Sequence, residues 1–128
     1  MCMVLFLSGL EVKVMEINKS NALRFWEECF GNKQFAEDFH GNLMCRDGYG
    51  NKNFFVINYY GQKIYCGWNI HHILPSACGG TNSKSNLLCT NITTNEEAAD
   101  RITFWIEESL YQVKKIQGTR DHKIIRIE

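Results

Sequence analysis

The spacing of apolar positions predicts one helix near the start of the chain, followed by short strands. Between residues 20 and 30, apolar side chains recur at intervals of three or four, as on one face of a helix. Ser20 or Asn21 is expected to cap this helix, and Gly31 to end it. Residues 35–39 are interpreted as a further helical turn. Strand-like runs are expected at 43–46, 53–59, 62–65, 87–92, 110–116 and 122–127.

The stretch between these runs combines a strand, a loop and a second helix. Residues 68–74 have the character of a strand, which Pro75 ends. Residues 76–85 are rich in glycine and hydroxyl side chains and predict a loop. The segment from Thr94 to Glu97 matches a capping box and predicts a helix of about a dozen residues. The side chains expected on its buried face are Ala98, Ile102, Trp105 and Ile106.

Length and composition narrow the class of protein. A chain of 128 residues predicts one domain, and 45% hydrophobic residues are enough for a packed core. Apolar runs stay shorter than the roughly 18 residues of a membrane span, so no membrane partner is expected. The net charge is zero, and charge as a whole therefore gives no sign of a nucleic-acid partner.

The cysteines favour a reducing compartment. There are six of them, and none forms a C-x-x-C pair, which is the usual spacing of a structural zinc site. A chain with this apolar content can fold without disulfides, so reduced thiols in the cytoplasm are expected, with three disulfides as the alternative. Cys66 and Cys89 are interpreted as buried thiols.

Residues 1–18 are expected to be an N-terminal extension or an edge strand. The apolar residues 1–10 fit three interpretations: a signal peptide, although the positive start and cleavage site are missing; a start codon upstream of the natural start at Met15; or a strand paired with 11–16. The domain itself is expected over 19–128.

The strongest chemical signal lies between residues 67 and 108. Two adjacent histidines, His71 and His72, lie toward the end of a predicted strand. Asn86 follows fourteen positions after His72, and Asn95 nine positions later, at the expected start of a helix. Imidazole serves both as a metal ligand and as a base near neutral pH, and an amide oxygen suits Mg²⁺ or Mn²⁺. Together these groups could hold a metal against a phosphodiester and activate a water molecule.

This pattern resembles the ββα-metal motif of the HNH endonucleases. The residues that carry the resemblance are His71, His72, Ile73-Leu74-Pro75, Gly79-Gly80, Asn86-Leu87 and Asn95. Upstream, FWEECFG and EDFHGNLM resemble segments that precede the motif in small phage-type members. The resemblance covers roughly residues 22–108. It implies a small single α+β domain with a ββα-metal (His-Me finger) core and flanking β-strands.

The resemblance also implies roles for the site residues. His72 would be the general base, His71 and Asn95 the metal ligands, and Asn86 the residue that fixes the loop or orients His72. One divalent ion is implied, Mg²⁺ or Mn²⁺ first, with Ni²⁺ or Zn²⁺ as alternatives. The implied function is metal-dependent hydrolysis of DNA by a phage or bacterial endonuclease. Two alternatives stay open: an inactive HNH-fold nucleic-acid-binding module, and a nuclease toxin with an immunity partner.

Three features depart from the family pattern. His71 stands where many members have an acidic residue, and Ala99 where some add a histidine. Glu96, Glu97 and Asp100 surround the expected helix start, where they could repel phosphate or contribute to a metal site. Because adjacent strand residues point to opposite faces, both histidines can reach one phosphate only if the strand ends, twists or bulges there.

The C-terminal run supplies the candidate DNA contacts. Lys114, Lys115, Lys123 and Arg126 lie there with a single acidic residue among them, Asp121. Such a run can contact phosphates, and a solvated hairpin face is the alternative. With a neutral chain, weak and largely non-specific DNA binding is expected. Sequence specificity would then come from a protein partner or a homodimer.

Overall fold

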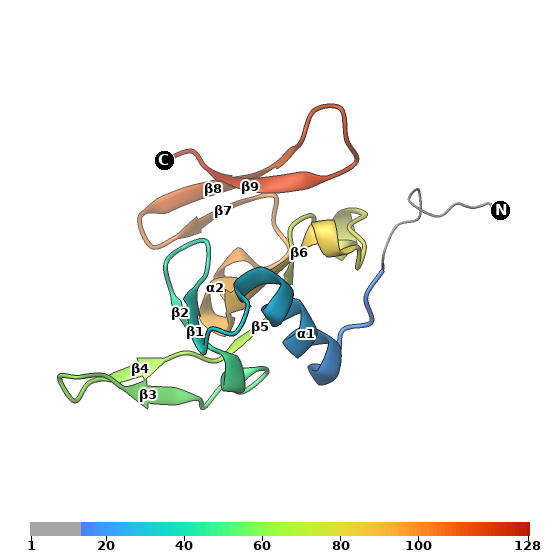
Figure 1. The fold of residues 1–128 in the computed structure, drawn as a ribbon. Helices are drawn as coiled ribbons and strands as arrows, with labels where there is room; N and C mark the ends of the chain where they lie inside the picture. Colours follow the sequence, from blue (N-terminus) through green and yellow to red (C-terminus); the bar gives the residue numbers. More distant parts are fainter. Residues whose placement is uncertain (1–13) are drawn as a thin grey trace.

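Short antiparallel strands are the main regular secondary structure of the molecule (Figure 1). The computed structural model describes residues 14–128, and over this range it contains two helices and nine strands. The strands pair as three two-stranded sheets, β1–β2, β3–β4 and β5–β6, and one three-stranded sheet, β7–β8–β9. The helices are α1 (Lys19–Phe30) and α2 (Ile92–Ala98). The strands are β1 (Phe35–Glu37), β2 (Leu43–Cys45), β3 (Phe55–Ile57), β4 (Lys63–Tyr65), β5 (Trp68–His72), β6 (Leu87–Asn91), β7 (Thr103–Ile106), β8 (Ser109–Lys115) and β9 (His122–Arg126).

The expected fold class is wrong. The resemblance implied an α+β domain with a ββα-metal core, whereas residues 14–128 form small antiparallel sheets with more strand than helix, and a ββα-metal core is not shown. The main reason lies after Ala98, where the expected long helix stops after seven residues. The next segment, Thr103–Ile106, alternates between exposed and buried side chains and pairs with β8. Its β-branched and aromatic residues suit such a half-buried strand.

Helix α1 confirms the first predicted element. Its buried side chains are Ala22, Phe25 and Trp26, and Gly31 follows its end with φ 65°, a backbone conformation that favours glycine. The predicted N-cap is wrong: Asn18 caps the helix, and its side chain accepts a hydrogen bond from the Asn21 N–H.

The further helical turn predicted at 35–39 is also wrong. Phe35–Glu37 forms β1, which pairs antiparallel with β2. The pairing places Ala36 opposite Met44, whose side chain is fully buried. An apolar run of a few residues is too short to distinguish the period of a helix from that of a strand. The pairing with β2 therefore determines the conformation of this segment.

Two hydrophobic clusters meet along β5. The first cluster joins α1 to the β5–β6 sheet and includes Trp26, Trp68 and Ile70. The second cluster joins α2 to the C-terminal sheet and includes Ile73 and Phe104. Ile70 belongs to the first cluster and Ile73 to the second, so the two histidines between them lie at the boundary of the clusters.

Three further expectations concern the N-terminal segment, membrane spans and two of the cysteines. The expected N-terminal strand and its alternatives lie largely outside the described residues, although Val14 forms an antiparallel bridge with Ser83. Over residues 14–128, no helix has the length and apolar character to cross a membrane. Cys66 and Cys89 are buried free thiols, as predicted.

Candidate active site

His71 and His72 are the last two residues of β5. They pair with Leu88 and Leu87 of β6, and this pairing holds the backbone of both histidines in an extended conformation. His71 is 5% exposed, and His72 is half-buried. Pro75 lies just beyond, where the missing N–H and the fixed φ of proline do not suit a continued strand.

The buried histidine contacts an asparagine of helix α2. His71 Nδ1 lies 2.6 Å from Asn95 Oδ1, a separation at which the ring N–H donates to the amide oxygen. The amide nitrogen of Asn95 donates to Asn69 Oδ1 at 2.7 Å, which fixes the orientation of the amide group. Asn95 is the fourth residue of α2 and not at its start, because Asn91 caps the helix four residues earlier.

Burial keeps the imidazole of His71 neutral. Removal from water lowers the pKa of His71 below its usual value of 6.5, and the neighbouring His72 adds to this effect. The hydrogen bond to Asn95 acts in the opposite direction but does not outweigh burial. At neutral pH one ring nitrogen of His71 therefore keeps a lone pair, as a metal ligand must.

His72 is held by a different asparagine. Its Nε2 lies 2.7 Å from Asn82 Oδ1 in the loop after β5. With Nε2–H donating to that oxygen, Nδ1 of neutral His72 carries the lone pair and can accept a proton. Asn82 was not among the predicted site residues, and its place two positions after Gly79-Gly80 was the only signal in the sequence.

Both histidines line one shallow pocket of about 140 Å³. The two residues line this pocket although their rings contact different asparagines, Asn95 in α2 and Asn82 in the loop after β5. Asn95 and Asp100 also line this pocket, so it gathers two imidazoles, an amide and a carboxylate. Asp100 follows Ala99, whose positive φ of 51° ends α2 and turns the chain.

Asn86 holds the loop between β5 and β6 in place through side-chain hydrogen bonds. Its Oδ1 accepts from the Leu74 N–H at 2.8 Å, and its Nδ2 donates to the carbonyl oxygens of Leu74 and Thr81. Gly80 packs closely against the backbone of Leu74, since an added Cβ would be 1.7 Å from the Leu74 carbonyl oxygen. Asn86 therefore corresponds to the loop-fixing role, and Asn82 is the asparagine that contacts His72.

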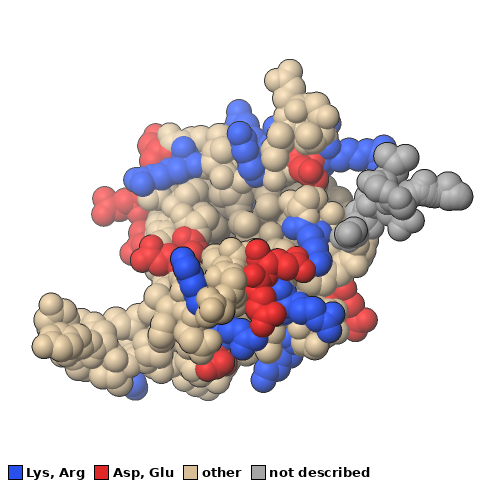
Figure 2. All heavy atoms as spheres, viewed as in Figure 1, with Lys and Arg blue, Asp and Glu red and all other residues tan. Residues whose placement is uncertain are grey.

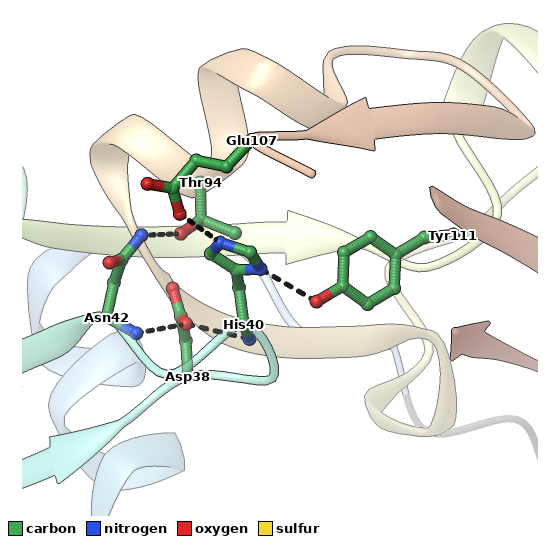
Figure 3. A network of polar contacts seen from close by, with 6 residues as sticks. All are labelled: Asp38, His40, Asn42, Thr94, Glu107 and Tyr111. Atoms are coloured by element: carbon green, nitrogen blue, oxygen red, sulfur yellow. Dashed lines mark hydrogen bonds and ion pairs between the residues drawn. The ribbon is translucent and has the colours of Figure 1, made fainter. Parts of the chain in front are cut away.

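A second polar network contacts helix α2 through Thr94 (Figure 3). Asp38, 8% exposed, accepts hydrogen bonds from the backbone N–H groups of His40, Asn42 and Asn91. Asn42 Nδ2 donates to Thr94 Oγ1 at 2.8 Å. The network thus holds both the N-cap of α2 and the residue that precedes Asn95.

The same turn is joined to the C-terminal sheet through His40. Its Nδ1 lies 2.7 Å from Tyr111 Oη, and its Nε2 lies 2.6 Å from Glu107 Oε1 (Figure 3). Glu107 has φ 53° in the tight β7–β8 turn, an unusual conformation for a residue with a side chain. Neither Asp38 nor His40 received a role from the sequence, because the partners that join them to other elements, Asn91, Tyr111 and Glu107, lie more than fifty positions away.

The predicted basic contacts do not form one surface. Lys114 pairs with Lys123 across β8 and β9, so these two side chains share one face of the sheet. Lys115 and Arg126 lie at positions of the other face, the one that carries Tyr111 and Val113. Figure 2 shows Lys and Arg interspersed with Asp and Glu over the face in view.

The pocket contains few of the side chains that usually bind metal ions. Within residues 14–128, no three His, Cys, Asp or Glu side chains are grouped closely enough to hold a metal. What the pocket does offer is the neutral imidazole of His71 and the amide oxygen of Asn95, with Asp100 on its wall. An ion with two protein ligands keeps positions for water and phosphate oxygens, which suits Mg²⁺ or Mn²⁺.

Comparison with known proteins identifies no relative of this chain. No family model matches the chain, and neither a curated protein nor a solved structure matches it significantly.

Proposed function

We propose that the protein is a metal-dependent endonuclease that hydrolyses phosphodiester bonds of DNA. One observation carries the proposal: a buried imidazole–amide pair, His71 and Asn95, and a second imidazole, His72, line one open pocket. The pair has the chemistry of a metal site, and the second imidazole that of a base. These side chains support the proposal independently of the fold that the resemblance implied.

In the proposed reaction His72 is the general base. Its Nδ1 takes a proton from the attacking water, while Asn82 Oδ1 accepts from Nε2–H and stabilises the imidazolium that forms. The strand end holds the ring at the rim of the pocket, where the half-buried side chain is open to solvent. His72 is therefore assigned the role of catalytic base and Asn82 that of a positioning residue.

His71 and Asn95 are assigned the metal site. A divalent ion bound there would stabilise negative charge on the phosphate and on the leaving oxygen. Burial of His71 keeps its ring neutral, and Asn69 fixes the orientation of the Asn95 amide. Because the Nδ1–H of His71 donates to Asn95 Oδ1, both atoms would face an ion only after this proton moved to Nε2. The two ligands belong to different elements, β5 and α2, so their separation depends on the packing between these elements.

The test is cleavage of supercoiled plasmid by the purified protein. We expect cutting with Mg²⁺ or Mn²⁺, and with Ni²⁺ as a further arm, but none with EDTA. His72→Ala should lower the rate by about 10²- to 10⁴-fold, the usual contribution of a positioned base. His122→Ala is the matched histidine control, because this residue lies on β9 and lines a separate cavity beside Gly80 and Asn86; its rate should stay far above that of His72→Ala.

Two results would count against the proposal. Cutting that survives in His72→Ala would mean a contaminating nuclease or a different site. Absence of cutting with every metal, while the protein still binds DNA, would favour the inactive binding module.

A further inference from the structure

The β3–β4 hairpin extends away from the rest of the molecule (Figure 1). Its strands are antiparallel, with Phe55 opposite Tyr65 and Ile57 opposite Lys63. The turn that joins them carries Tyr59 and Tyr60. Tyr59 is 95% exposed and Tyr60 82%, among the most exposed large side chains of the described residues. Exposed aromatic rings gathered at one tip are unusual on a free surface and indicate an interaction site.

The turn that carries these tyrosines is well braced. Asn58 Oδ1 accepts from the backbone N–H groups of Tyr60 and Gln62, both at 2.9 Å. Gly61 supplies the positive φ of 78° that the turn requires. A braced turn presents the two rings with little ordering cost on binding, which favours a functional use of the tip.

The charge around the hairpin favours a polyanionic partner. No Asp or Glu occurs from Gly48 to Asn95, a stretch that contains the hairpin and the two histidines of the candidate site but not Asp100. The same stretch contains Lys52, Lys63 and Lys84. In Figure 2 the projecting hairpin is almost wholly tan and shows no acidic atoms. A phosphate backbone would therefore meet no carboxylate on the hairpin itself, and the nearest ones are Glu96 at its base and Asp100 at the site.

The base of the hairpin adjoins the helix of the candidate site. Asn91, the N-cap of α2, donates to the Tyr65 carbonyl oxygen at 3.3 Å. A groove of about 510 Å³ separates the hairpin base from α2, with Phe55 and Tyr65 on one side and Ile92 on the other. Lys52 reaches across to Glu96, the residue after Asn95, with 3.5 Å between the charged atoms.

We infer that the tip of the β3–β4 hairpin stacks on unpaired bases of single-stranded DNA and guides it to the site. The choice of DNA rests on the proposed function. Stacking on an aromatic ring needs an exposed base face, which single strands offer and an intact duplex does not. Lys63, 4.9 Å above the Phe55 ring, lies where it can meet the backbone of the same strand.

The test is the affinity for a fluorescein-labelled 20-nucleotide single strand, measured by anisotropy in EDTA. We expect the double variant Tyr59→Ala/Tyr60→Ala to weaken binding by about tenfold or more, since each stacked base contributes substantially. Tyr59→Phe/Tyr60→Phe should stay within about twofold, because stacking uses the ring and not the hydroxyl. Binding to a blunt duplex should change much less than binding to the single strand.

Trp105→Ala is the matched control, because Trp105 is an exposed aromatic, 49% accessible, on β7 away from the hairpin. It should bind as the unaltered protein does. Equal affinity of the double alanine variant and the unaltered protein would overturn the inference. A dimer in solution that the double alanine variant disrupts would do the same, because the tip would then bind a second copy.

The two proposals fail separately. Binding in EDTA involves no chemistry, so tyrosine-dependent binding without plasmid cleavage would refute the nuclease alone. Cleavage that depends on His72, with binding that ignores Tyr59 and Tyr60, would refute the hairpin inference alone.

Discussion

Replacement of Asp38 tests whether a buried carboxylate holds helix α2 in place. Asp38→Ala removes the acceptor for three backbone N–H groups, those of His40, Asn42 and Asn91, at 2.9–3.0 Å. A hydrogen bond to a charged acceptor contributes about 1.5–3 kcal/mol, but the three do not add fully because the turn relaxes. We expect the free energy of unfolding to fall by about 3–4 kcal/mol.

Urea unfolding, followed by the fluorescence of the buried Trp26 and Trp68, measures this loss. With a slope near 2 kcal/mol per molar urea, the midpoint should fall by about 1.5–2 M. Asp38→Asn, which keeps one acceptor oxygen, should lose about half as much. Asp47→Ala is the control: this aspartate is exposed, and its contact with Gln34 is 3.5 Å long. A loss below about 1 kcal/mol in Asp38→Ala would refute the reasoning.

Three further predictions concern backbone strain, close packing and pH. Ala99→Gly should raise the free energy of unfolding by about 1 kcal/mol, since φ 51° and ψ −136° strain any residue with a Cβ; a less stable variant would contradict this. Gly80→Ala should lower it by about 2 kcal/mol or more, since the new Cβ would meet the Leu74 carbonyl oxygen, and a neutral effect in the same urea assay would exclude the clash. Burial lowers the pKa of His71, so below pH 6.5 the unfolded chain takes up a proton before the folded one does. Stability should therefore fall as pH decreases from 6.5, and less steeply in His71→Gln; equal pH profiles of the two proteins would show that His71 is not responsible.

The sequence predicted elements well where local chemistry decides them. Helix α1 has an apolar face, a polar cap and a terminal glycine within one short segment, so its limits were close to correct. The strand-like runs around β5 and β6 were also found, because Pro75 and the following loop separate them. In both cases the deciding residues lie within a few positions of one another.

The second helix shows where this reasoning fails. The capping-box pattern placed the cap at Thr94, whereas the structure uses Asn91 and buries Thr94 against Asn42. That contact joins residues 52 positions apart, and no local pattern reports it. Trp105, expected to be buried on the helix, is instead exposed on β7, because pairing with β8 makes the residues alternate.

The same distinction between local patterns and distant contacts applies to the residues of the candidate site. The adjacent histidines and Asn95 could be selected from residue type and spacing, and the structure does bring His71 to Asn95. The residues that hold them, Asn82 and Asp38, could not be selected from the sequence. Their positions depend on how the loop closes and on tertiary contacts.

This division explains why the Asp38 variant bears on function as well as on stability. The two proposed metal ligands lie on elements that belong to different hydrophobic clusters, since Ile70 packs in one cluster and Ala98 in the other. Residues at such a boundary keep their separation only if something ties the two sides together. Asp38 supplies a tie by binding the Asn91 N–H at the junction of β6 and α2. A folded Asp38 variant should therefore lose plasmid cleavage through displacement of Asn95, although Asp38 itself does not line the pocket.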